Sequence, residues 1–326
     1  MPQEIVMEET RSFMKSRVIL TAAELDFFTR LDEKPSGAKE LAQYLKLDEM
    51  ATTRVLDCCV TFGLLKKKKT HYHVTEKGAF LSSRNPETVL PMVLHMNHEW
   101  TIWSSLTDIV RQGRRAQHEP GLAFSEEWWK AFVGAMHVAA RGLSIEIADA
   151  YDASRFKRLL DVGGASGTYT IAFLRKNPEM TAVIFDLEDV IPMAEERIKA
   201  EALDDRVRFV VGDYYENDLP EGCDFALLSA IIHQNSVEEN VNLFRKIHKA
   251  LLPAGTLLIR DHIMDESRTY PPAGALFAIN MLVNTQGGDT YDFRTVKGML
   301  EQAGFKDVKL LRTGEKMDCL VEAHKA

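Results

Sequence analysis

The residues best suited to holding a charged small molecule gather in one glycine-rich segment, RLLDVGGASGT over residues 158–168. Its apolar first half predicts a buried strand, and the following YTIAFLRK predicts a helix. Glycines there let a ligand approach the backbone, and a helix N-terminus favours a negative group. A phosphate-binding P-loop would need glycine where Thr168 or Tyr169 stands. The dinucleotide pattern counted from Gly163 would need glycine in place of Ala165 and Thr168, so this pattern is weak.

The spacing that remains is Asp161-x-Gly163-x-Ala165-x-Gly167, with Gly164 between the first two positions of the turn. It resembles the acidic-x-G-x-G-x-G motif of class I S-adenosylmethionine (SAM) methyltransferases, with alanine at the middle glycine. The resemblance implies that Asp161, Gly163, Gly164 and Gly167 contact SAM.

Two further strand ends carry carboxylates in the positions that such a cofactor requires. Asp186, followed by Leu187, ends the next apolar run 19 residues past Gly167, where a carboxylate can accept bonds from both ribose hydroxyls. The third run ends in Val211-Gly212-Asp213-Tyr214, which puts Asp213 near the adenine amino group, with Leu187 and Tyr214 on either side of the ring. Strand-end aspartates also cap loops, but three such ends in register favour a cofactor site.

The elements that must position these residues alternate between β-rich runs and amphipathic helical stretches from about residue 154 onward. The runs are RLLDVGG, TAVIFDL, VRFVVGD, FALLSAII, TLLIRDHI, VKLLRT and DCLVEAH. This alternation predicts an α/β fold with a mostly parallel, Rossmann-like sheet. The short segment 313–316 predicts an antiparallel hairpin between the last two strands, at the edge of the sheet.

The front of the chain has a different pattern, which predicts a small helical domain. Helices are expected from Gly37 and over residues 50–62, and Gly63 is expected to end the second. LLKKKKTHYHVTEKGAFL then predicts two short strands about a basic turn, so the whole unit reads as a winged helix. We place the domain boundary near residue 145, giving a domain 1–145 and a catalytic domain 146–326.

Composition narrows the classes of function. The chain has 326 residues, of which 45% are hydrophobic and 27% charged, with a net charge of −8. This acidity argues against a protein that coats nucleic acid. The second helix of the winged unit would present Arg54 to DNA, but also the acidic Asp57. The sequence has no run of about 20 apolar residues, so we expect no membrane span. The acidic start of the sequence likewise predicts no signal peptide. Four cysteines, two of them adjacent, suit a reducing compartment, so we expect a cytoplasmic protein.

Taken together, LLDVGGASG, FDL, VGDYY, the histidine after FALLSAII and QAGFKDVKL resemble the two-domain small-molecule O-methyltransferases of the caffeate and hydroxyindole type. The resemblance covers nearly the whole chain and implies a homodimer formed through the N-terminal domain. It also implies that His233 is the general base and that Asp261 orients it. Base catalysis of this kind is worth roughly 10²–10⁴-fold, although a histidine at a strand end can equally be structural.

The chain departs from the family pattern at three positions near this histidine. Gln234 replaces the aspartate that usually follows the base, and Ser229 replaces a lysine that lies near the cofactor. Thr290 stands where a second orienting acid is expected, with Asp289 next to it. These changes leave two alternatives open: methyl transfer from SAM to nitrogen, carbon or another centre, and a SAM-sensing DNA-binding regulator built on the winged helix.

The acceptor is expected in a pocket lined by two helices. Phe132 and Met136 match the family helix that contacts substrate, and Phe277, Asn280, Met281 and Asn284 lie on one helical face at i, i+3, i+4 and i+7. Ordinary core packing gives the same spacing. No metal is expected, because His71 with His73 and His95 with His98 make no HExxH motif and have no cysteine pair to complete a tetrahedral set.

Overall fold

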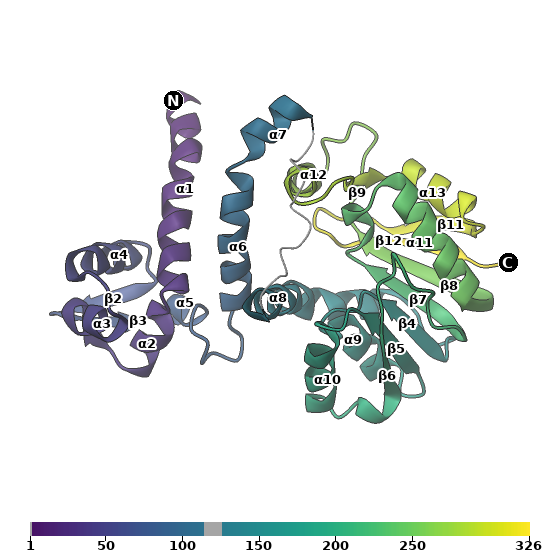
Figure 1. The fold of residues 1–326 in the computed structure, drawn as a ribbon, viewed down its shortest axis with the longest axis horizontal. Coiled ribbons are helices and arrows are strands. Elements are labelled where there is room, and N and C mark those ends of the chain that lie inside the picture. The colour runs from purple at the N-terminus through teal and green to yellow at the C-terminus, as the bar shows by residue number, and fades with distance from the viewer. Residues whose placement is uncertain (1, 114–125) are drawn as a thin grey trace. The chain divides into compact units, whose positions relative to one another are not determined.

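The computed structural model describes residues 2–113 and 126–326, with side chains from residue 129 onward in the second range. The chain forms two compact units, Met1–Thr101 with Lys130–Val138, and Ile102–Trp129 with Ala139–Ala326. Helices α6 (Leu90–Trp103) and α8 (Glu126–Ala150) contribute residues to both (Figure 1). The boundary expected at residue 145 falls within α8.

The first unit contains the expected winged helix. Asp48 caps the second helix of the pair by accepting a hydrogen bond from the Ala51 N–H at 2.7 Å. Leu56, Cys59 and Tyr72 lie in the small core beneath this helix. The wing strands pair antiparallel in the sheet order β1-β3-β2. The elements before α6 are α1 (Pro2–Glu24), α2 (Phe27–Glu33), β1 (Ser36–Gly37), α3 (Ala38–Leu45), α4 (Glu49–Thr61), β2 (Leu65–Lys68), β3 (His71–Val74) and α5 (Glu76–Ala79).

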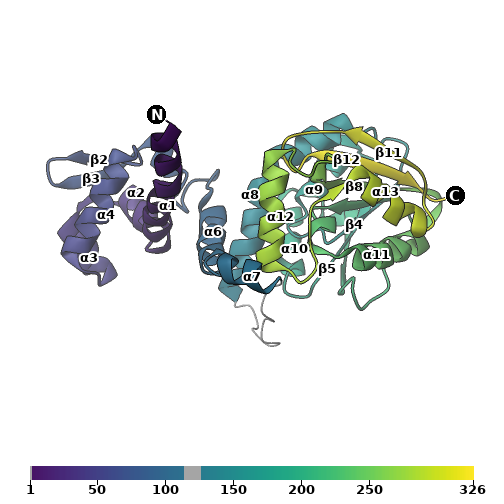
Figure 2. The same ribbon diagram turned by 90° about the horizontal axis from the view of Figure 1, so that it is seen from above.

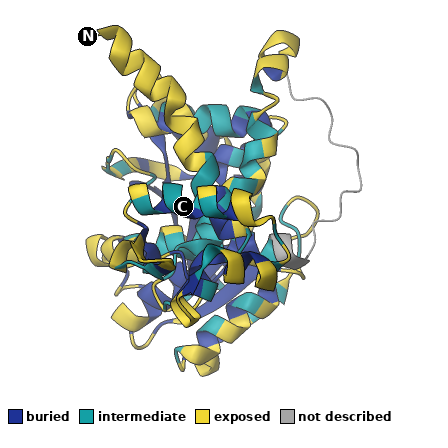
Figure 3. Cartoon of the chain, turned by 90° about the vertical axis from the view of Figure 1, so that its left-hand side faces the viewer, coloured by how far each residue is buried: buried dark blue, intermediate teal, exposed yellow. Residues whose placement is uncertain are grey.

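Helix α1 is exposed over most of its length, as the yellow ribbon next to the N-terminus in Figure 3 shows. Only Leu20, Ala22 and Ala23, near its end, are buried. Farther toward the N-terminus, the Phe13 ring lies 6.4 Å from the ring of Trp100 on α6. The apolar side chains of Val6, Met7 and Met14 are exposed.

The second unit is built on a seven-stranded sheet of order β11-β12-β8-β7-β4-β5-β6. The five strands from β8 to β6 are parallel, and β12 pairs antiparallel with both β8 and β11. All seven predicted strands and the C-terminal hairpin are therefore confirmed. The elements of the sheet and its loops are α7 (Leu106–Gln112), β4 (Arg158–Val162), α9 (Thr168–Lys176), β5 (Thr181–Asp186), α10 (Ile191–Ala200), η1 (Asp204–Arg206), β6 (Val207–Val211), β7 (Cys223–Ser229), η2 (Ile232–Gln234), α11 (Val237–Ala250), β8 (Leu251–Asp261), β9 (Ile263–Met264), α12 (Pro272–Asn284), β10 (Tyr291–Asp292), α13 (Phe293–Gln302), β11 (Lys306–Arg312) and β12 (Cys319–His324).

Helices cover both faces of this sheet. On one face α11 and α13 bury Phe244 and Leu300 against the strands, and on the other α9 and α10 bury Phe173 and Ile198 (Figures 1 and 2). Because strands buried on both sides carry apolar residues throughout, β4, β5 and β7 read as continuous hydrophobic runs. The carboxyl ends of parallel strands meet at one edge, which is where ligands bind in such sheets.

One helical segment among the residues that the structure describes, Trp129–Ala150 in α8, is long and apolar enough to cross a membrane by length and composition. The core helix of a soluble protein meets the same criterion.

Candidate active site

The glycine-rich loop joins β4 to α9 at the carboxyl edge of the sheet. Gly163 and Gly167 adopt left-handed backbone angles, with φ of +66° and +69°, which residues other than glycine rarely adopt. The Gly163 N–H donates to the Phe185 carbonyl at 2.9 Å, and the Gly167 N–H donates to the Gly164 carbonyl at 2.8 Å. The loop is therefore fixed against β5 and carries no side chain at the positions where the predicted motif has glycine.

Asp186, at the end of β5, reaches this loop. One carboxylate oxygen accepts a hydrogen bond from the Ala165 N–H at 2.7 Å, and the other accepts from the Leu187 N–H at 2.8 Å. Burial raises the pKa of Asp186, and these two N–H groups oppose the rise. Each carboxylate oxygen keeps a further lone pair, so the group can still accept two hydroxyl donors. Leu187 next to it is exposed, as a residue expected to flank a ligand ring would be.

Asp161 lies beneath the loop rather than on its surface. Only 2% of its surface is exposed, and its carboxylate accepts a hydrogen bond from the Thr170 hydroxyl at 2.6 Å. Burial raises the pKa of Asp161 to about 6, and the nearby charge of Asp186 adds to the rise. A Cβ placed on Gly164 would come within 3.0 Å of the Asp161 Cγ, so the loop packs directly on this carboxyl.

The third predicted strand end, at β6, joins the same edge. The Gly212 N–H donates to the Asp186 carbonyl at 2.9 Å. One carboxylate oxygen of Asp213 accepts from the Tyr215 N–H at 2.8 Å, and the Asp213 N–H donates to the side-chain oxygen of Asn217 at 2.8 Å. Asp213 therefore caps its loop through one oxygen, and its other oxygen has no hydrogen-bond partner in the described part of the chain.

Tyr214 connects this edge to the segment that carries His233. Its hydroxyl accepts a hydrogen bond from the side-chain amide of Gln234. A Cβ on Gly163 would come within 3.8 Å of the Tyr214 ring, so the ring lies beside the glycine loop. The departure from the family pattern at Gln234 thus has a structural role, which the sequence alone did not reveal.

His233 and Asp261 form the pair that the family resemblance implies. Both carboxylate oxygens of Asp261 lie 2.9 Å from Nδ1 of His233, and one also accepts from the His262 N–H at 2.7 Å. Although burial alone would raise the pKa of Asp261, the adjacent His233 and Arg260 hold it below its usual value. An ionised Asp261 makes Nδ1 the protonated nitrogen, which leaves Nε2 with a free lone pair.

The second acidic position is not filled by a neighbour. The carboxylate of Asp289 lies 2.6 Å from the guanidinium of Arg268, and only its backbone N–H contacts His233, donating to the His233 carbonyl at 2.8 Å. Thr290 donates its hydroxyl to the Gly274 carbonyl at 3.2 Å. Asp261 is therefore the carboxylate that bonds the His233 ring.

Helix α12 brings part of the predicted acceptor pocket to this pair. The Phe277 ring packs edge-on against His233, with centroids 4.8 Å apart, and also lies 5.3 Å from His262. Asn280 accepts a hydrogen bond from the Trp103 indole N–H at 2.9 Å, and the Asn284 amide donates to the same oxygen at 3.2 Å. One turn from Phe277, Met281 is buried.

The other predicted acceptor residues, Phe132 and Met136, belong to the first compact unit. The Phe132 ring packs on His95 with centroids 5.6 Å apart, and Met136 is half-buried. The structure describes them within that unit only. Of the tryptophans before them, the side chain of Trp128 lies outside the described residues.

Ser229, at the end of β7, accepts a hydrogen bond from Nε of Arg260 at 2.8 Å. Arg260 is a residue that sequence reasoning missed, because a single arginine in an apolar strand carries no motif. Its contact follows from the register of two parallel strands, in which Ser229 lies opposite Arg260. Within the described ranges, no group of three or more histidine, cysteine, aspartate or glutamate side chains is arranged to hold a metal ion.

The residues at this edge fit SAM. The glycines at 163, 164 and 167 let the loop pack closely on Ile231, Asp161 and Ile184. Asp186 keeps lone pairs for a ribose diol. The carboxyls of Asp161 and Asp186 provide a negative field that suits a sulfonium cation.

Comparison with known proteins agrees with this geometry. Residues 103–306 match the O-methyltransferase domain family, and residues 7–84 match the O-methyltransferase dimerisation domain. The chain is similar to the tetracenomycin polyketide synthesis 8-O-methyl transferase of Streptomyces glaucescens, with 29% identity over 93% of this chain and 91% of that protein. It is also similar to acetylserotonin O-methyltransferase of Gallus gallus, with 28% identity over 98% of this chain and 96% of that protein.

Among solved structures, the fold matches human N-acetylserotonin methyltransferase in complex with SAM. The TM-score is 0.85 at 24% identity, covering 100% of this chain and 98% of the human one. At this identity the likeness concerns the fold, a Rossmann-like methyltransferase sheet preceded by a helical domain.

Proposed function

Because the chain belongs to the O-methyltransferase family and is a SAM-dependent enzyme, we propose that it methylates a hydroxyl group of a small aromatic or secondary-metabolite acceptor, with His233 as general base. The observation that carries this proposal is the buried bond between His233 and Asp261. It sets the imidazole in the tautomer that can take a proton, on the segment that follows β7 at the carboxyl edge of the sheet.

Bound SAM supplies an electrophilic methyl group on a sulfonium. The residues of the chain supply the base. A phenol has a pKa near ~10 and an imidazole near ~6.5, so proton transfer is uphill unless it accompanies attack by the oxygen. Nε2 of His233 accepts the hydroxyl proton, and Asp261 stabilises the resulting imidazolium through Nδ1. Such positioned base catalysis contributes roughly 10²–10⁴-fold to the rate.

The cofactor in this proposal occupies the carboxyl edge of the sheet. Asp186 accepts the ribose hydroxyls, Asp213 accepts the adenine amino group, and Leu187 and Tyr214 flank the ring. The loop approaches SAM with its backbone. The full proposed set is Asp161, Gly163, Gly164, Gly167, Asp186, Leu187, Gly212, Asp213, Tyr214 and Ser229.

The acceptor in this proposal lies against α12. Phe277 supports it, because the ring contacts His233 directly. An aromatic edge next to the base suits a flat ring on the acceptor. We assign Asn280, Met281 and Asn284 to the same wall, and we propose Phe132 and Met136 as further acceptor-binding residues.

The first domain, 1–145, is proposed to form the homodimer and to line the acceptor pocket, while 146–326 binds SAM. The match to the dimerisation domain and the exposed apolar side chains of α1 support this. All four cysteines are free thiols, which suits a cytoplasmic enzyme. We expect neither nucleic acid nor membrane as a partner.

An acceptor screen with labelled SAM tests the function, repeated on His233→Ala and on His71→Ala, an exposed histidine of β3, as the matched control. We expect transfer to hydroxyl acceptors by the wild type and the control, and a loss of roughly 10²-fold or more in His233→Ala. Binding of S-adenosylhomocysteine, the demethylated product, should be unchanged in both variants. Equal turnover in His233→Ala would remove the base from the mechanism.

Transfer to nitrogen or carbon is the second candidate. It is favoured by the altered acidic set, since Asp289 bonds Arg268 and not the His233 ring. A nitrogen acceptor that is a free nucleophile needs no base. The screen separates the two candidates, because His233→Ala would retain activity toward such an acceptor. Asp57 on α4 is bonded to Lys67 and Tyr72 of the wing, which gives the DNA-binding alternative little support.

A further inference from the structure

Arg260 is a buried cation that forms no ion pair in the part of the chain that the structure describes. Only 7% of its surface is exposed. Nε donates to the Ser229 hydroxyl at 2.8 Å and Nη1 donates to the Met317 carbonyl at 2.7 Å, which are both neutral acceptors. In the part of the chain that the structure describes, no carboxylate lies within ion-pair distance of the guanidinium, and Nη2 makes no hydrogen bond. The neighbouring Asp261, whose pKa Arg260 helps to lower, bonds His233 instead. Because a buried charge with only neutral hydrogen-bond partners is costly, such a group suits a ligand of opposite charge.

Tyr169 provides a second unpartnered group at the same place. Its ring lies under the Arg260 guanidinium, 5.0 Å from centroid to Cζ. The residue is 7% exposed, and its hydroxyl lies near that of Ser229 without making a hydrogen bond of good geometry among the described residues. Burial raises the pKa of Tyr169, so the hydroxyl keeps its proton and is available as a donor. An unsatisfied buried hydroxyl is rare in folded proteins and calls for an acceptor.

Both groups lie at the carboxyl edge that holds the glycine loop. Arg260 is opposite Ser229, the last residue of β7, and Tyr169 is the second residue of α9, directly after the loop. The N-terminus of α9 adds a positive dipole end. A guanidinium without an ion pair, a hydroxyl without a hydrogen bond and a helix N-terminus therefore converge beside the proposed cofactor site.

We propose that Arg260 and Tyr169 bind the carboxylate of the methionine half of SAM, an inference that rests on the proposed placement of the cofactor. A carboxylate is planar, and the guanidinium can offer it two donors in one plane. Arg260 thus restores, from the neighbouring strand, a positive charge beside Ser229, where the family carries a lysine. Arg260 and Tyr169 act as positioning residues in this account, since they hold the cofactor and touch no reacting atom.

The test is calorimetric and needs no turnover. SAM is compared with decarboxylated SAM, which keeps the adenosine, the sulfonium and the amine and lacks only the carboxylate. We expect the wild type to bind SAM roughly 10- to 100-fold more tightly, the range for a charge-assisted hydrogen-bonded pair. Arg260→Met should remove this preference by weakening the binding of SAM alone, and Tyr169→Phe should reduce the preference several-fold. Arg155→Met, which removes an arginine paired with Glu322, is the matched control and should keep the preference.

Three results would overturn the proposal. The first is equal affinity of the wild type for the two ligands, a comparison that stands even where a variant does not fold. The second is an equal loss of affinity for both ligands in Arg260→Met, which would show that the arginine only supports the structure. The third is an undiminished preference in that variant. In each case, binding of decarboxylated SAM by the wild type would still support the proposed cofactor site. If the wild type bound neither ligand, both the cofactor site and the carboxylate contact would be contradicted.

Discussion

The side-chain amide of Gln234 donates a hydrogen bond to the hydroxyl of Tyr214. This bond joins the residue after the proposed base to the residue after Asp213, although 20 positions separate them in the chain. This bond therefore links the proposed adenine side of the site to the proposed catalytic side, and next to it the Tyr215 hydroxyl donates to the side-chain oxygen of Asn235.

Removing that bond is expected to weaken cofactor binding. Gln234→Ala and Tyr214→Phe should each raise the Kd of S-adenosylhomocysteine by about 2- to 10-fold, the range for one neutral hydrogen bond. Because both variants remove the same bond, the double variant should be no weaker than the poorer single variant. Titration calorimetry on the four proteins checks this, and additive losses would show that the two side chains act separately.

Neutralising Asp261 is expected to slow methyl transfer without loosening the cofactor. In Asp261→Asn the side chain no longer fixes the proton on Nδ1 of His233, so we expect kcat to fall roughly 10²–10⁴-fold. The Kd of S-adenosylhomocysteine should change less than about threefold. Asp289→Asn is the matched control, because Asp289 bonds Arg268 and leaves the His233 ring alone. A comparable loss in that control would show that Asp289 does serve the base.

The buried carboxyl of Asp161 predicts a stability that depends on pH. Its pKa is raised from 3.8 to about 6 in the folded protein, so the folded state holds the proton more tightly than the unfolded state. The wild type should therefore lose stability as the pH rises from about 4 to about 7, by about 3 kcal/mol in all, and remain level above that. Asp161→Asn, which cannot ionise, should lack this decline.

Denaturant unfolding of the ligand-free proteins measures the effect. At pH 7.5 the Asn variant should be the more stable one, and near pH 4 the two should agree. Asp205→Asn, at an exposed position of η1, should follow the wild type at both values. A wild type that is as stable as Asp161→Asn at pH 7.5 would show that the carboxyl ionises beneath the loop without cost.

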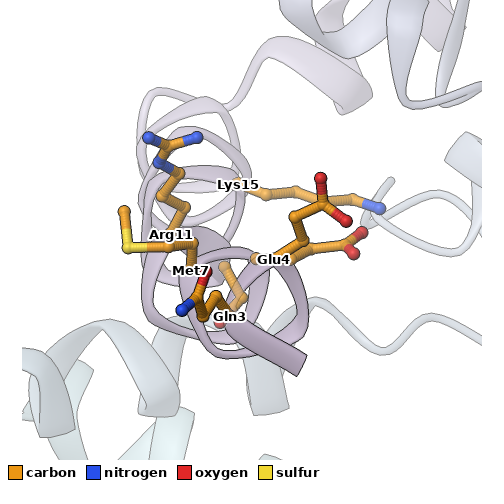
Figure 4. Close-up of a pocket in the computed structure, with 7 residues that line it drawn as sticks. Gln3, Glu4, Met7, Arg11 and Lys15 are labelled. Carbon is orange, nitrogen blue, oxygen red and sulfur yellow. The ribbon is translucent and has the colours of Figure 1, made fainter. Parts of the chain in front are cut away.

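The exposed apolar side of α1 predicts where two copies of the chain meet. Val6 and Met14 are 57% and 56% exposed, and Val6, Met7, Phe13 and Met14 gather on one side of the helix. The hollow in Figure 4 lies between Met7, at the border of the apolar side, and the charged residues Glu4, Arg11 and Lys15, and it is lined by α1 residues alone. The apolar side is the one suited to an obligate interface.

We expect Val6→Glu/Met14→Glu to be monomeric in analytical ultracentrifugation at concentrations where the wild type is a dimer. Ser12→Glu, on the charged side, should leave the dimer intact. Since these positions are exposed, far-UV circular dichroism should show both variants folded. A dimeric double variant would place the interface elsewhere in the first domain.

The sequence predicted the parts of the site that depend on local pattern. Asp161, Gly163 and Asp186 lie where strand periodicity and the turn put them, because an apolar run ending in a polar residue marks a strand end whatever surrounds it. The seven strands and the last hairpin were predictable for the same reason. His233 and Asp261 came from the family resemblance, and their 2.9 Å contact is a fact of the structure.

The contacts that were missed depend on how distant strands align. The bond from Arg260 to Ser229 requires the register of β7 against β8, which no local pattern encodes. A shift of one residue would turn Arg260 to the opposite face of the sheet. The Gln234 bond to Tyr214 likewise depends on two loops meeting above the sheet edge, and the partner of Asp289 depends on where Arg268 falls.

Strand β12 lies between β8 and β11, although it follows both of them in the sequence. A ribosome must therefore release residues 319–324 before β11 has a neighbour to pair with, since β12 is its partner in the sheet. The carbonyl of Met317, which holds the Arg260 guanidinium, arrives with the same final segment. A nascent chain thus completes this edge of the sheet only after residues 317–324 have emerged, so a product truncated before Met317 lacks both β12 and the carbonyl that holds Arg260.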